Sequence, residues 1–142
     1  MEIFDENDIV RGRFFSLWID GELYAEVKGA DSTSELKTEQ VPIAGQLGEG
    51  ERVVGSTGSG SLTFWKTYNG LNQKINECIK NNKAFVFDLT GQSNDPECDG
   101  YERVTIQKCK MKKFKPLQGD ITKNLLENTY DFSYNTQNVN YE

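Results

Sequence analysis

Residues 13–28 read RFFSLWIDGELYAEVK, and this stretch decides the fold class. Asp20-Gly21 is a two-residue turn signal between two runs rich in apolar and aromatic residues, which is the strongest short-range signature of a β-hairpin. The first run is apolar on both faces, with Phe15, Leu17 and Ile19 on one and Phe14 and Trp18 on the other. Such a hairpin is expected to be covered on both sides or to lie at an interface.

Further strand-like runs occupy 34–43, 61–66, 83–90, 101–114 and 127–135. The first of them is mostly polar and carries Pro42 near its end, which favours an edge strand. In 101–114 the apolar residues change face, which predicts a β-bulge near Gln107–Lys108. Only 69–82 has helical spacing, through Leu71, Ile75, Cys78 and Ile79. Six or seven strands, one helix and no βαβ rhythm predict a mainly β fold: an antiparallel β-sandwich or partial barrel with one flanking α-helix.

The 142 residues fit one domain. We expect a flexible N-terminal segment at 1–12, a β domain at 13–135 and a C-terminal tail at 136–142. Within the domain, 44–60 predicts a long loop that becomes ordered against a neighbouring subunit, because its six glycines have wide backbone freedom. They are Gly45, Gly48, Gly50, Gly55, Gly58 and Gly60.

Composition narrows the function classes. The chain has no histidine, so catalytic sites that use a histidine base and metal sites that use histidine ligands are excluded. No motif indicates a catalytic centre, a metal site or a cofactor. A net charge of −6 disfavours tight binding to nucleic acid. Three widely spaced cysteines indicate a reducing compartment, and without a run of about 18 apolar residues we expect no membrane anchoring.

Two surface features have open interpretations. Lys108, Lys110 and Lys112 alternate on a predicted strand, so they would line one face, either as a solvated row or as a docking strip for an acidic partner. Trp18 and Trp65 are candidates for the core and for an interface alike, since tryptophan is enriched in both places.

The order of these features resembles the tail-tube proteins of contractile phage tails, in the group typified by PBSX-type prophages and R-type bacteriocins. The matching stretches are SLWIDGELYAEVKGADSTSELKTEQVPIAG (16–45), GSTGSGSLTFWK (55–66), GLNQKINECIKNN (70–82), KAFVFDL (83–89), YERVTIQKCKMKKF (101–114) and ENTYDFSYN (127–135).

This resemblance implies a structural subunit, not an enzyme, that forms stacked hexameric rings around a channel. The implied partners are further copies, the sheath, and the baseplate, tape-measure and tail-terminator proteins, with DNA only in transit. The implied location is a virion or phage-tail-like particle assembled in the bacterial host cytoplasm, and the lysine row would face the sheath. Two alternatives stay open: a secretion-system tube protein of related fold, and a monomeric β-sandwich binding module.

Overall fold

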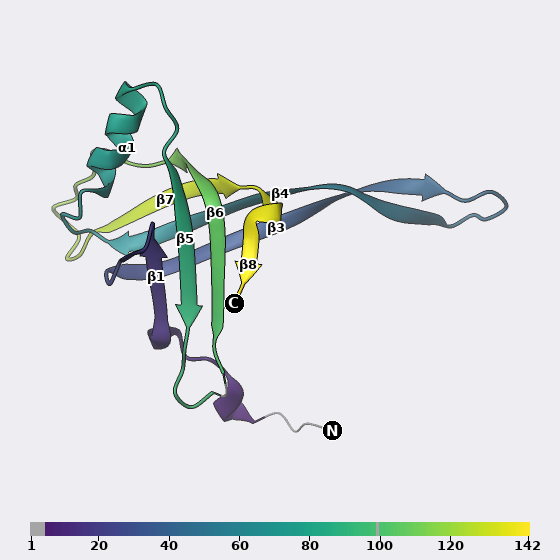
Figure 1. Ribbon diagram of the computed structural model, residues 1–142, viewed down its shortest axis with the longest axis horizontal. Helices are drawn as coiled ribbons and strands as arrows, with labels where there is room; N and C mark the ends of the chain where they lie inside the picture. Colours follow the sequence, from purple (N-terminus) through teal and green to yellow (C-terminus); the bar gives the residue numbers. More distant parts are fainter. Residues whose placement is uncertain (1–4, 99) are drawn as a thin grey trace.

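The computed structural model describes residues 5–98 and 100–142 (Figure 1). Within them lie the strands β1 (Phe15–Ile19), β2 (Glu22–Leu23), β3 (Val27–Pro42), β4 (Glu49–Trp65), β5 (Val86–Ser93), β6 (Glu102–Lys113), β7 (Glu127–Tyr134) and β8 (Val139–Tyr141). One α-helix, α1 (Leu71–Lys80), and the 3-10 turns η1 (Glu6–Asp8), η2 (Gly12–Phe14) and η3 (Thr136–Asn138) complete the described elements.

The strands form one antiparallel sheet in the order β2-β1-β5-β6-β7-β4-β3, with β8 paired to β6. The sheet bends over itself, so that β1, β5 and β6 run across β3, β4 and β7 in Figure 1. It stays open and ends in the edge strands β2 and β3. This confirms the predicted antiparallel sandwich or partial barrel with one helix.

The predicted hairpin at Asp20-Gly21 is present. Both residues have positive φ, 52° and 81°, as a tight two-residue hairpin turn requires. The turn joins β1 to the two-residue strand β2, with Trp18 opposite Leu23. The face with Leu17 and Ile19 is buried, whereas Trp18 on the other face is only half-buried.

The predicted bulge is also present. Ile106 pairs with Leu89 and Cys109 pairs with Phe87, so two residues of β6 oppose Asp88 alone. The Asp88 carboxylate accepts a hydrogen bond from the Lys108 backbone N–H at 3.0 Å, and Lys108 has φ 55°. Because of the extra residue, the apolar side chains on both sides of the bulge, Ile106 and Cys109, point into the core.

The core fills the end of the sandwich nearest α1. Its largest buried side chains form two aromatic pairs, with ring centroids 5.8 Å apart for Phe64 and Tyr130 and 6.0 Å apart for Phe87 and Phe132. The Tyr130 hydroxyl donates a hydrogen bond to Asn72 of α1 at 2.6 Å. Leu71 and Ile75 of the helix are buried against this core, but Ile79, predicted on the same stripe, is exposed.

The predicted C-terminal tail is wrong in its last part. Val139–Tyr141 form β8, which pairs with Val104–Ile106 of β6. This strand is short and flanked by polar residues, so the sequence shows no apolar alternation that would predict it. Within the described ranges no helix is long and apolar enough to cross a membrane.

Candidate functional site

The most prominent feature is a two-stranded ribbon that projects from the body, toward the right in Figure 1. We call it the arm: Glu35–Pro42 of β3, Glu49–Thr57 of β4 and the connection between them. Strand β7 pairs with β4 only from Gly58 to Trp65, so the arm lies beyond the rest of the sheet. At ~3.3 Å per residue, eight residues of β3 carry its tip about 26 Å outward.

The arm corrects the predicted loop at 44–60. Residues 49–60 are strand, and only 43–48 connect the two strands. The composition was misleading, because glycine, serine and charge are disfavoured in ordinary strands. A usable signal was that the polar stretch before Pro42 and the stretch after Gly48 are of similar length and can pair across one turn.

The six glycines do different work. A Cβ on Gly58 would overlap the ring of Tyr134, and a Cβ on Gly60 would lie 2.5 Å from Phe132 Cζ. The absence of a side chain at these two glycines therefore lets the Tyr134 and Phe132 rings pack directly against β4. Gly45 has φ 81° and supports the turn at the tip, whereas a Cβ on Gly48 would meet nothing within 4 Å.

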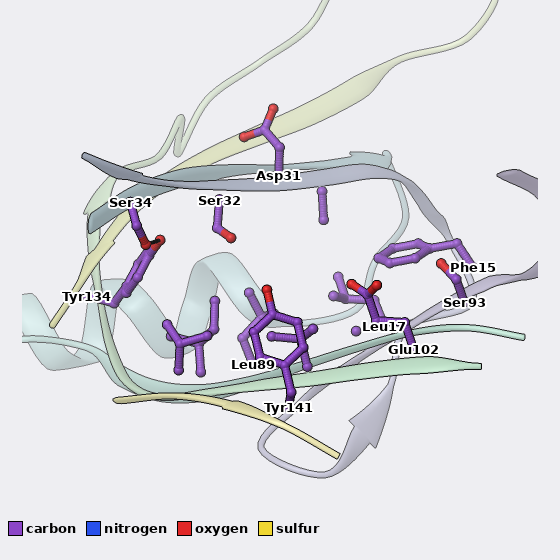
Figure 2. Close-up of a pocket in the computed structure, with 15 residues that line it drawn as sticks. Phe15, Leu17, Asp31, Ser32, Ser34, Leu89, Ser93, Glu102, Tyr134 and Tyr141 are labelled. Carbon is purple, nitrogen blue, oxygen red and sulfur yellow. Dashed lines mark hydrogen bonds between the residues drawn. The ribbon is translucent and has the colours of Figure 1, made fainter. Parts of the chain in front are cut away.

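A groove lies at the end of the sandwich away from α1, between β3 and the strands β1, β5, β6 and β8 (Figure 2). Its volume is about 480 Å³. Buried Leu17, Leu89 and Ile106 form part of its apolar lining. Ser32 points into it from β3, and Glu102 and Tyr141 point into it from the opposite side. Small side chains on β3 leave this half of the sandwich underfilled.

The arm and the groove share one surface. Ala30, Ser32 and Ser34 line the groove, and side chains two apart on a strand face the same way, so Leu36 continues the groove along the arm. Cross-strand partners share a face, which places Val53, Glu51 and Glu49 on this side too. Leu36 and Val53 are both exposed.

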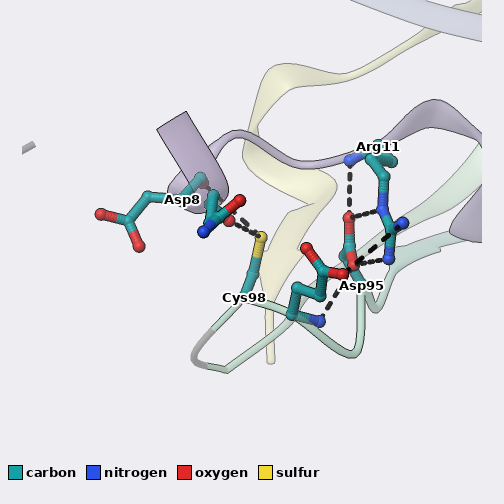
Figure 3. Close-up of polar contacts among 6 residues, drawn as sticks. Asp8, Arg11, Asp95 and Cys98 are labelled. Atoms are coloured by element: carbon teal, nitrogen blue, oxygen red, sulfur yellow. Dashed lines mark hydrogen bonds and ion pairs between the residues drawn. The ribbon is translucent and has the colours of Figure 1, made fainter. Parts of the chain in front are cut away.

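The N-terminal segment is anchored, contrary to the predicted flexibility of 1–12 (Figure 3). Arg11 donates from Nε and Nη2 to the two carboxylate oxygens of Asp95, at 2.9 and 2.8 Å, and its backbone N–H donates to the same carboxylate. The side-chain bonds from Arg11 hold the pKa of Asp95 well below its usual value. The Cys98 thiol donates to the carbonyls of Asn7 and Asp8. Residues 1–4 lie outside the described residues.

The predicted lysine row is irregular. Lys108 lies in the bulge opposite Asp88, and a second register shift falls between Met111 and Lys113. All three side chains are nevertheless exposed and alternate with the more buried Cys109 and Met111. Their role as a docking strip stays a prediction.

The two tryptophans lie on separate strands. Trp18 on β1 is half-buried with the Arg103 guanidinium 5.6 Å from its ring, and Trp65 on β4 is exposed with the Lys28 ammonium 5.0 Å away. Neither belongs to the buried core, so a role at an interface stays a prediction.

Comparison with known proteins decides the family. The family model described as "Phage tail tube protein" matches residues 2–139. The chain belongs to this family. It is thus a structural tail-tube subunit, as its resemblance to the group predicted. The tail-tube subunit is also 25% identical over 126 residues to the phage-like element PBSX protein XkdM of Bacillus subtilis (strain 168), covering 88% of this chain and 86% of the relative.

Solved structures agree on the fold. The tail-tube subunit is similar to the tube-terminating cap of the anti-feeding prophage, with a TM-score of 0.78, 8% identity and coverage of 99% of this chain and 95% of that one. It also matches a chain of the sheath-tube complex of the extracellular contractile injection system PVC, with a TM-score of 0.74, 10% identity and coverage of 94% and 91%. At such identities the likeness concerns the fold alone.

Proposed function

We propose that this subunit forms the inner tube of a contractile tail, as hexameric rings that stack around a channel. The observation that carries the proposal is the arm, a ribbon with exposed apolar side chains and no covering layer of its own. A two-stranded ribbon is marginally stable alone in water. It gains a third layer or a further strand when another copy packs against it.

The same proposal gives the glycine-rich segment its role. We infer that 49–57, with the tip at 43–48, is the inter-subunit assembly element that the sequence suggested as a loop. Long unpaired edges invite strand addition, and closing sheets into a ring removes that hazard. Trp65 and Trp18, each with a cation near its ring, are candidates for the same ring contacts.

The tube works without catalysis in this account. Its partners are further copies, the sheath, and the baseplate, tape-measure and tail-terminator proteins. DNA is in transit if the particle carries a genome, and assembly takes place in the cytoplasm of the bacterial host. The exposed Lys108, Lys110 and Lys112 are proposed to meet acidic groups of the sheath, where repetition along the tube makes individually weak pairs effective.

Shortening the arm tests this function. In the test variant, 37–55 are replaced by Asn-Gly, which joins the paired residues Leu36 and Ser56 through a two-residue turn. We expect a folded monomer with an unchanged thermal midpoint, because the core lies elsewhere, and no filaments. The control replaces only Gln73, an exposed residue of α1 outside the arm, by Ala. Filaments of normal length from the shortened protein would contradict the proposal.

A further inference from the structure

Exposed apolar side chains also gather at the other end of the molecule. The connections 66–70 and 114–126 lie beside α1, opposite the arm along the long axis (Figure 1). The Lys66 ammonium joins them by donating to the Gln118 carbonyl at 2.6 Å. We call this pair of connections the loop end. Its exposed apolar residues are Tyr68 (103%), Leu117 (93%), Ile121 (104%) and Leu125 (68%).

Three of these side chains are almost fully exposed and that of Leu125 is about two-thirds exposed, so they are little packed within the subunit. A cluster of four on adjacent loops is an apolar patch of the kind that marks an interaction site. Its charge is basic, with Lys66, Lys115 and Lys123 against Asp120. The loop end is thus an apolar surface with basic groups around it.

We call the side of the arm that continues the groove, with Leu36 and Val53, its inner side. The surface shared by the groove and this inner side has the opposite charge. Leu36 and Val53 are exposed on the arm, and the groove beside them has an apolar floor. Among the described residues that the register and Figure 2 place on this surface, the charged ones are Glu49, Glu51 and Glu102. The subunit therefore has an apolar, acidic surface along the groove and arm, and an apolar, basic surface at the loop end opposite the arm.

We propose that the loop end of one copy docks onto the groove and the inner side of the arm of the next copy. Apolar side chains of the two surfaces would meet at the centre of the contact. Around them, glutamates of the groove and arm would face lysines of the loop end, as is general at protein interfaces. The two surfaces differ, so the contact is head-to-tail and leaves a free surface of each kind at the ends of a stack. Such a contact continues indefinitely, which is the requirement for a tube. This inference rests on the proposed tube function and names its stacking contact.

Cross-linking tests the contact directly. In a background with Cys78→Ser and Cys98→Ser, Val53→Cys and Ile121→Cys are combined in one chain, and filaments are oxidised mildly. Cys109 stays, because it is fully buried. We expect a ladder of covalent multimers. The matched control pairs Val53→Cys with Ile9→Cys, another exposed apolar residue, and should give none. If filaments form but the ladder appears with Ile9→Cys and not with Ile121→Cys, the proposed contact is wrong. The proposed tube function would not be affected by that result.

Charge reversal supplies a second readout. Glu51→Lys and Lys123→Glu should each raise the concentration needed for filament growth about two- to fivefold, and the double variant should restore it. A double variant that assembles no better than either single variant overturns the contact. A parent protein that forms no filaments at all overturns the tube function itself.

Discussion

Arg11 and Asp95, 84 residues apart, form a bidentate ion pair. This pair anchors the N-terminal segment to the connection between β5 and β6. Asp95 is buried, and Arg11 contributes two side-chain donors and one backbone donor to it. Such an arrangement favours the ionised carboxylate over its protonated form, so the pKa is lowered.

Asp95→Asn is expected to lower the thermal midpoint at pH 7 and to expose the N-terminal segment to proteases. Because the pKa of Asp95 is lower in the folded protein, its stabilisation is present above the usual carboxyl pKa of about 4 and declines as pH falls below it. The difference in midpoint between the variant and the parent should therefore shrink from pH 7 to pH 3. Equal differences at both pH values would contradict this role of the pair.

Gly60→Ala should destabilise the subunit by about 1–3 kcal/mol, because the new methyl group would meet the Phe132 ring and the Asp31 backbone oxygen. Gly48→Ala is the control, since its methyl group would enter open space. Urea unfolding compares the two. If both glycines were only flexible loop residues, both substitutions would have the same small effect.

The arm should exchange its amide hydrogens faster than the body in the free subunit. Residues 49–57 pair only with β3, whereas 58–65 lie between β3 and β7. Local opening is easiest where few buried contacts hold a strand. In assembled tubes we expect the amides of 49–57 to become protected. Unchanged exchange of the arm on assembly would be evidence against its role as the assembly element.

Replacing Lys108, Lys110 and Lys112 together by Glu should leave tubes normal but impair sheath assembly around them. All three side chains are exposed, so the fold is expected to tolerate the change. Electron microscopy of co-expressed tube and sheath measures the sheathed fraction. Normal sheathing would mean that these lysines are only solvated.

The local features of the fold were predictable from sequence, and the long-range ones were not. The Asp20-Gly21 turn and the bulge at Lys108 each depend on residues close in the chain. The strand character of 49–57 depends on pairing across the arm, which overrides the local preference of glycine and serine.

The proposed assembly segment was chosen from its glycines, and the sequence did not predict its form. Residues 49–60 are strand, and Gly58 and Gly60 serve core packing. The contact between Arg11 and Asp95 left no local signal, because one sequence does not show which distant charges meet. The same reason hid the pairing of β8 with β6.

Negative-stain electron microscopy of the purified subunit tests the central claim most directly. The protein should form straight tubes with a central channel at high concentration, and end-on views should show sixfold rings. A subunit that stays monomeric, with no rings or filaments under any condition, would contradict the account and favour a monomeric β-sandwich binding module.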